Sequence, residues 1–346
     1  MARLKKQRKR LCESLIKGNA LRDNRGINHF LIYKPLIYFF LLWGFFNPHG
    51  IQSQDANYSQ FELAPLHLNP GLTGSFDGNF RMLSTYREQW TSILGEQSYR
   101  DGYISIDHPF SINSKYDLGI GAHASFDRAG ETRLRNHLYS LSTAITRHLD
   151  TDGENNNSVT LGISLGYLTR QIDTSMLRFP GPAFTVIPKK SNFHLSVGST
   201  WSYGWNERSF VHLGIAIHHI NRPNISLTGD ETRLATRNNL HGKVELQISQ
   251  RLSLVPSFMY AFQGPHDQFL FGTSGKIFTK SDNQSSYFQL GIYGMTTEIE
   301  NQETQVNACI INANTRLKSI LLGFSYDRFT DLGSDAFEFT LGYIME

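Results

Sequence analysis

The chain has 346 residues, of which only 18% are charged and 12% are aromatic, and its two cysteines exclude a disulfide-rich scaffold. The formal net charge is +3, but the first 53 residues hold ten lysines and arginines against two acids, so the rest of the chain has a net charge of −5. That remainder has none of the basic clustering of a nucleic-acid-binding protein, and no nucleic-acid partner is expected.

Residues 1–53 have the organisation of an export signal. A long basic stretch leads into the apolar run 36–46, which has the length of the hydrophobic region of a signal peptide and is too short to span a bilayer comfortably. We expect cleavage near Ser53 or Gln54 and therefore an exported mature chain. A membrane anchor and a misplaced start are the alternatives.

The next segment, residues 54–78, is too rich in proline and glycine for a strand. Pro65 and Pro70 have no backbone N–H to donate, while Gly71 and Gly74 permit tight turns. Its apolar residues are nevertheless too frequent for a linker. We expect a plug or periplasmic collar that packs Phe61, Leu63, Leu66 and Leu68 against the inner wall or rim of a larger unit, and a flexible remnant is the alternative.

From residue 79 onward the sequence alternates between large apolar residues and small or polar ones. In residues 159–167 every odd position is apolar and every even position is small or polar, which is the period of a β-strand. The same pattern recurs in residues 118–126, 193–201, 211–219, 320–326 and 337–343. No apolar run approaches the length of a transmembrane helix, and the second face lacks the charge that covers a soluble β-sandwich.

Fourteen such windows, bounded by turn residues, are expected to be strands. They are 79–90, 98–108, 116–126, 135–148, 158–170, 192–202, 209–219, 237–248, 252–262, 268–278, 286–297, 303–311, 317–327 and 335–345. An even number of ten-residue strands in an exported chain predicts an all-β transmembrane barrel over residues 79–346, because only closure pairs every backbone polar group in lipid. A soluble β-protein would instead expose a very large apolar band to water.

The connections and the aromatic residues give the barrel a predicted orientation. The long connections 150–157, 173–190 and 221–236 are expected outside the cell, whereas 250–251 and 312–315 are expected to be short turns. Aromatic residues near strand ends are expected at the two membrane interfaces. They are Tyr86, Trp90, Tyr99, Tyr139, Trp201, Trp205, Tyr260, Tyr287, Tyr326 and Tyr343.

Several motifs, taken together in order and spacing, resemble one family. The residues that carry the resemblance, and that we expect to take part in interactions, are Tyr58, Ser59, Gln60, Phe61, Pro65, Leu68, Asn69, Pro70, Gly71, Gly74, Arg87, Gln89, Trp90, Asn221, Pro223 and Asn224. Further landmarks are 263–265 and 323–327. The chain resembles the PorP/SprF family of outer-membrane proteins of the type IX secretion system in Bacteroidetes over residues 55–346, with Ala64 where members usually carry asparagine.

The resemblance implies a non-enzymatic outer-membrane component of the type IX secretion and gliding machinery. Such a barrel would anchor periplasmic subunits of the machine, or act as the surface partner of an exported adhesin-like protein. Its partners would be outer-membrane lipid, other secretion subunits and a secreted adhesin. A hypothesis of another class is a passive diffusion or uptake channel whose small polar inner face conducts solutes.

Candidate chemistry is weak throughout the mature chain. His212 and His218 share the predicted lumen face, but a metal site would need a third ligand such as His194 or His241, and hydrogen-bonded histidines are commoner. There is no Gly-x-Ser-x-Gly elbow, phosphate loop, dinucleotide fingerprint or EF-hand. We therefore expect no catalytic, cofactor or metal site, and we expect Cys309 to be a small packed residue.

Overall fold

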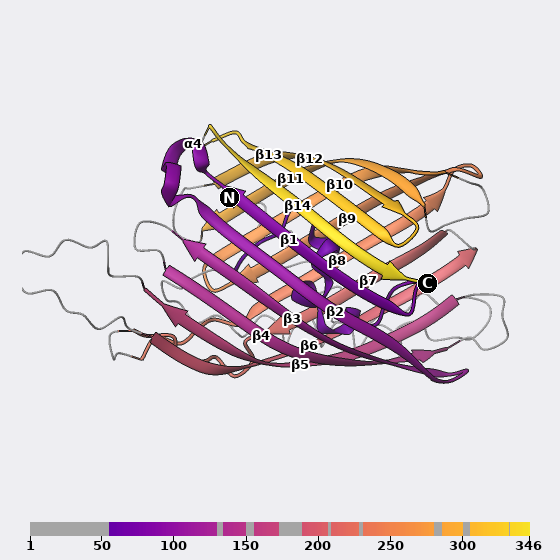
Figure 1. Cartoon of the computed structure of the whole chain (residues 1–346), viewed down its shortest axis with the longest axis horizontal. Coiled ribbons are helices and arrows are strands. Elements are labelled where there is room, and N and C mark those ends of the chain that lie inside the picture. The colour runs from indigo at the N-terminus through magenta and orange to yellow at the C-terminus, as the bar shows by residue number, and fades with distance from the viewer. Residues whose placement is uncertain are drawn as a thin grey trace, which may run out of the picture. The chain divides into compact units, whose positions relative to one another are not determined.

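The computed structural model describes residues 55–129, 134–149, 156–172, 189–206, 209–227, 231–279, 286–299, 305–331 and 333–346. The predicted export signal, residues 1–53, thus lies outside the described residues. Within them, fourteen antiparallel strands form one closed barrel, in which each strand pairs with its sequence neighbours and β1 pairs with β14 (Figure 1). No described helix is both long enough and apolar enough to cross a membrane.

The strands are β1 (Phe80–Gln89), β2 (Tyr99–Asn113), β3 (Tyr116–Ala129), β4 (Leu134–His148), β5 (Asn156–Gln171), β6 (Lys189–Asn206), β7 (Ser209–His218), β8 (Arg237–Gln247), β9 (Leu252–Gln263), β10 (His266–Phe278), β11 (Tyr287–Ile299), β12 (Gln305–Leu317), β13 (Ile320–Phe329) and β14 (Ser334–Met345). The helical turns are η1 (Phe61–Leu63), α3 (Pro65–Leu68), η2 (Pro70–Leu72), α4 (Thr91–Leu94) and η3 (Gly95–Gln97). The predicted barrel of fourteen strands is confirmed.

The alternation along each strand separates a lipid-facing surface from the lumen. Leu165 is 61% exposed, whereas the neighbouring Ser164 is 1% exposed and faces inward. Leu161 and Tyr167 follow the outward pattern of Leu165. Because successive side chains of a strand point to opposite faces, the large apolar residues form the outer wall and the small polar ones line the interior.

One predicted turn is wrong. Residues 312–315 lie within β12, and the turn to β13 falls at Lys318 and Ser319. The alternation continues through this polar stretch, because Asn312 and Asn314 are buried lumen positions. Residues 312–315 also pair in register with both β11 and β13. Asparagine is a turn residue in a general sequence, but on the inner face of a barrel it is an ordinary strand residue.

The antiparallel order defines two rims. The connections that follow β1, β3, β5 and the other odd-numbered strands lie at one rim, while those that follow even-numbered strands lie at the other, together with the start of β1 and the end of β14. The two-residue turns 114–115 and 318–319 belong to the second rim, and the first rim has one such turn among the described connections, 264–265. We call the second rim the inner rim, because short turns face the periplasm in such barrels, and the first is the outer rim.

This strand order corrects one predicted loop position. The connections after β5 and β7 start from the outer rim, as expected for 173–190 and 221–236, although residues 173–188 and 228–230 lie outside the described residues. The connection after β4 starts from the inner rim, so it cannot share a rim with the connections after β5 and β7, as the prediction for 150–157 requires. Strand order, rather than loop length or polarity, decides the rim; residues 150–155 themselves are not described.

Most of the predicted interfacial aromatic residues face outward, but three do not. Tyr99 lies at an inward position of β2, with its ring centroid 4.7 Å from that of Trp90. Trp90 packs against the buried core, with its ring centroid 6.2 Å from that of Phe329, and Tyr287 lines a cavity in the lumen. Tyr287 points inward because odd-numbered positions of β11 face the lumen. Cys309 was expected to be packed, yet it is exposed, because it occupies an outward position between the buried Ala308 and Ile310.

The lumen is filled by two different sources of side chains. On the β9–β12 side, inward residues such as Met259, Leu270 and Ile310 form an apolar core together with Phe61 and Leu68 from the N-terminal segment. On the β3–β8 side the inward residues are mostly glycine, serine, threonine and histidine, and residues 55–78 occupy the space beside them. The barrel interior is therefore a packed core over much of its height.

A charge on the lipid-facing wall tests this sidedness. Ile163 is 42% exposed in the middle of β5, so Ile163→Arg is expected to lower the free energy of unfolding by about 2–4 kcal/mol, since arginine is costly at the bilayer midplane. Ile112→Arg, at the inner-rim end of β2, is expected to cost about 0–1 kcal/mol. Denaturant titration of barrels folded into lipid vesicles measures both costs. Equal costs would contradict the placement of Ile163 at the bilayer midplane and of Ile112 near the inner rim.

Candidate functional site

Residues 55–78, which we call the plug, run through the lumen from the outer rim to the inner rim. The backbone N–H of Asp55 donates to Gln263 at the outer-rim end of β9, 3.0 Å away. Gly78 lies against Met345 at the inner-rim end of β14. In between, the chain bends through η1, α3 and η2, seen as the indigo turns inside the ring of strands in Figure 1.

The second half of the plug follows the inner wall so closely that the wall needs glycine. A Cβ atom on Gly198 would collide with the side-chain oxygen of Asn69, and one on Gly162 would collide with the carbonyl oxygen of Pro70. The Asn69 side chain is completely buried, and its Nδ2 lies 3.1 Å from the carbonyl oxygens of Ser199 and Ile215. Strand glycines therefore form the groove that accepts the plug backbone.

A buried ion cluster holds the first half of the plug against the seam between β1 and β14. Arg87 of β1 contacts Asp327 at 2.7 Å and Glu338 at 3.3 Å. The Glu338 carboxylate also accepts the backbone N–H groups of Ser59 at 2.8 Å and Gln60 at 3.0 Å, and the Ser59 hydroxyl donates to Asp327. One cation and the plug amides thus stabilise two carboxylates that are almost completely buried.

A second ion pair holds the end of the plug near the inner rim. Arg81 and Asp107 lie 2.7 Å apart, and Asp107 also accepts the backbone N–H of Gly74 at 2.8 Å. The Arg81 guanidinium donates to the carbonyl of Leu72 and stacks over Phe76, 4.4 Å from the ring centroid. Polar wall residues near the outer rim and near the inner rim therefore both have plug atoms as partners.

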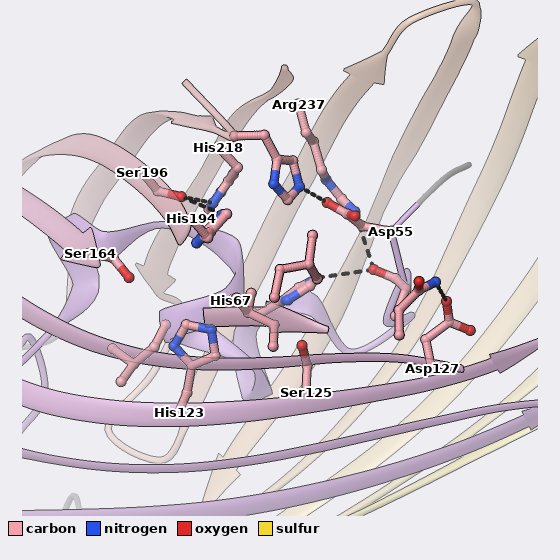
Figure 2. A pocket seen from close by; sticks show the side chains of 16 residues that line it. Asp55, His67, His123, Ser125, Asp127, Ser164, His194, Ser196, His218 and Arg237 are labelled. Carbon is pink, nitrogen blue, oxygen red and sulfur yellow. Dashed lines mark hydrogen bonds and ion pairs between the residues drawn. The ribbon is translucent and has the colours of Figure 1, made fainter. Parts of the chain in front are cut away.

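Histidines gather around a small cavity of about 40 Å³ between the plug and the wall (Figure 2). His67 of the plug lies 3.0 Å from the carbonyl oxygen of Ala56, and His218 lies 3.2 Å from that of Leu68. Burial lowers the pKa of His67 to about 4, so its ring is neutral near pH 7. His212 and His218 face the lumen as predicted. Among the described residues, no three His, Cys, Asp or Glu side chains are arranged to hold a metal ion.

Comparison with known proteins identifies the family. The family model described as type IX secretion system membrane protein PorP/SprF matches residues 51–343. The chain belongs to the PorP/SprF family. A search of curated proteins gave no match.

Solved structures share the fold of this PorP/SprF chain at low sequence identity. A FadL homologue of Pseudomonas aeruginosa is 12% identical with a TM-score of 0.50, and the match covers 86% of this chain and 100% of that one. The toluene transporter TbuX of Ralstonia pickettii is 10% identical with a TM-score of 0.47, and the match covers 81% and 93%. At this identity the likeness to the first shows the barrel fold alone.

The structure brings most of the motif residues of this PorP/SprF protein together, in the plug and along β1. The residues of the plug motif that are buried in the lumen are Tyr58, Ser59, Gln60, Phe61, Pro65, Leu68, Asn69, Pro70 and Gly71, and Gly74 is half-buried. Arg87 joins the ion cluster and donates to Gln89. Trp90 follows β1 at the outer rim, where its backbone N–H donates to the carbonyl oxygen of Asp335 at 2.9 Å.

The second motif stays apart from the plug, at the outer rim. Asn221 donates to the carbonyl oxygen of Phe193 at 2.7 Å, and Asn192 donates to that of Asn224 at 2.6 Å. Pro223 is buried between them. These contacts fold the start of the β7–β8 connection onto the edge of β6.

Sequence reasoning missed the acidic partners of the plug. Asp327 lies in the landmark 323–327 and Glu338 in a predicted strand, but no contact with the plug is predicted for either, although each is at most 1% exposed and contacts Arg87. A signal was present, because Glu338 stands between Phe337 and Phe339 at an inward position of β14. A carboxylate alternating with lipid-facing aromatics must lie in the lumen and needs a partner there.

Removing the cation of the ion cluster is expected to destabilise the plug. Arg87→Gln leaves two buried carboxylates without their cation, so the free energy of unfolding should fall by about 3–5 kcal/mol. The matched control is Arg328→Gln, which breaks the exposed pair with Asp335 and should cost less than about 1 kcal/mol. Denaturant titration provides the comparison, and a small effect at Arg87 would contradict the role of the cluster.

Filling the groove under the plug is expected to displace it. Gly198→Ala places a methyl group against Asn69 and should cost about 1–3 kcal/mol, with residues 55–78 becoming sensitive to proteinase K. Gly275→Ala is the control, because this strand glycine lies at an outward position of β10, where a Cβ meets no atom within 4 Å. Mass spectrometry of the digests reports the cleavage sites; if both variants protect the plug equally, the close fit has no energetic importance.

Proposed function

We propose that this PorP/SprF barrel works as a non-enzymatic binding component of the outer-membrane part of the type IX secretion and gliding machinery. In this role it anchors periplasmic machine subunits at its inner rim, or serves at its outer rim as the surface partner of an exported adhesin-like protein. The observation that carries the proposal is the plug, which occupies the lumen through buried ion pairs and close backbone contact. The fixed interior supports a binding platform.

The proposal includes the way in which the chain reaches the membrane. Residues 1–53 would act as a cleaved export signal, residues 54–78 as the plug and residues 79–346 as the barrel. Support comes from Asp55, which is hydrogen-bonded inside the lumen only a residue or two after the expected cleavage site. Both the closed barrel and the family fit an outer-membrane location.

A diffusion channel is the second candidate, and one observation favours it. A cavity of about 600 Å³ lies between the plug and the inner rim, so part of the lumen is open space. Conduction would require the plug to leave its groove. Ser59 would then lose its hydrogen bonds to Asp327 and Glu338. The cost of exposing that ion cluster favours the binding platform.

Two measurements on the affinity-tagged full chain test the proposed function. We expect type IX secretion subunits to co-purify with the detergent-solubilised barrel, and we expect no steady conductance in planar bilayers. Arg87→Gln, which loosens the plug, is expected to give fluctuating conductance, because the barrier is the plug itself. Steady solute-permeable conductance of the wild-type chain without secretion subunits would establish the channel instead.

A further inference from the structure

The cavity of about 600 Å³ below the plug, which we call the vestibule, has a charged wall. Its roof is the plug from Phe61 to Asp77, and its sides are the inner-rim halves of strands on both sides of the barrel. Lys243, Lys276 and Arg316 lie on alternate strands β8, β10 and β12 and all line it. The opposite wall carries the neutral polar groups Asn156, Ser158, Thr160, Ser202 and Asn206, and its acid Asp117 lies 2.7 Å from His148.

The three cations differ in how well they are paired. Lys243 lies 2.9 Å from Glu62 of the plug, and Lys276 lies 3.0 Å from Glu245 of β8. Burial alone would raise the pKa of Glu62, but the Lys243 ammonium holds it below the ordinary value, so this pair is ionised. The acids that neutralise these two lysines are thus built into the wall and the plug.

Arg316 has a weaker acidic partner, although its Nε donates to the carbonyl oxygen of Lys318 at 2.9 Å. Its Nη2 lies 3.6 Å from a carboxylate oxygen of Glu346, beyond the 2.7–2.9 Å typical of a charge-assisted hydrogen bond. The Glu346 side chain is 57% exposed, whereas that of Arg316 is only 10% exposed. A nearly buried guanidinium, whose fork geometry suits bidentate carboxylate binding, therefore meets a solvent-exposed carboxylate at the mouth of the vestibule.

The surroundings of Arg316 add positive charge and aromatic surface. Arg251 and Lys318 lie in the β8–β9 and β12–β13 turns of the same rim. The Lys276 ammonium lies 4.5 Å from the ring centroid of Tyr287 and 5.0 Å from that of Phe278. This sector would attract an acidic segment and offer flat rings to its apolar side chains.

We propose that the vestibule is the docking site for an acidic polypeptide segment of a periplasmic partner, and that Arg316 binds a carboxylate of that segment in the place that Glu346 holds. The inference rests on the proposed function and specifies its inner-rim contact. Glu346 is the internal stand-in for the partner's carboxylate, and the neutral polar wall supplies hydrogen-bonding groups for a peptide backbone. The partner is identified only by its chemistry, as an acidic and partly aromatic chain segment.

A labelled octapeptide of alternating glutamate and tyrosine is the probe, titrated against the full chain in detergent micelles and followed by fluorescence anisotropy. Arg316→Gln is expected to weaken its binding about tenfold, as for the loss of a charged hydrogen bond. Glu346→Gln should tighten binding, because it removes the competing carboxylate. Arg328→Gln, at the outer rim, is the control that leaves binding unchanged.

Opposite signs for Arg316→Gln and Glu346→Gln support the site. Equal binding of a peptide with glutamine in place of glutamate, displacement by inorganic phosphate at the peptide's own concentration, or no response to either variant would overturn it. Glu346→Gln alters only an exposed side chain, so it decides the matter even if Arg316→Gln fails to fold. If these tests fail while secretion subunits still co-purify with the wild type, the docking site is wrong and the proposed function stands.

Discussion

The requirement that every strand amide and carbonyl be paired in lipid governs this molecule. It is met by closure, with β1 and β14 in uninterrupted register from the Phe80–Met345 pair to the Gln89–Ala336 pair. Closure fixes which side chains of each strand point outward, and the apolar ones do. The other face of every strand is then directed into a narrow lumen, where buried polar groups such as Glu338 need partners that water does not supply.

The plug supplies those partners, and the wall in turn satisfies the plug. Backbone amides of Ser59 and Gln60 donate to Glu338, while wall residues such as Asn239 donate to plug carbonyls such as that of Leu68. A segment with two prolines and no regular ladder has many backbone groups to satisfy, and an inner face of serine, asparagine, histidine and glycine satisfies them. Plug and barrel therefore depend on each other energetically, as parts of one core.

The strands were predictable because alternation is a local property, and the family was predictable from motif order. The contacts between the plug and the ion cluster were not predictable, since Ser59 and Glu338 lie 279 positions apart and no local pattern links them. Small volume suggested a packed Cys309, but strand position placed it on the outer wall. The rim of residues 150–157 likewise follows from counting strands, which overrides the loop-like composition of the segment.

The plug connects the two rims of the barrel. Asp55 contacts His219 at the base of the β7–β8 connection, and seven positions later Glu62 pairs with Lys243 in the vestibule. Communication between the rims would require a second arrangement of the plug with comparable free energy. Moving it would remove the hydrogen bonds of Ser59 and Gln60 and leave two buried carboxylates with Arg87 as their one cation, so the ion cluster disfavours such a state. The plug therefore keeps one arrangement, and binding at one rim is not expected to change the surface at the other rim.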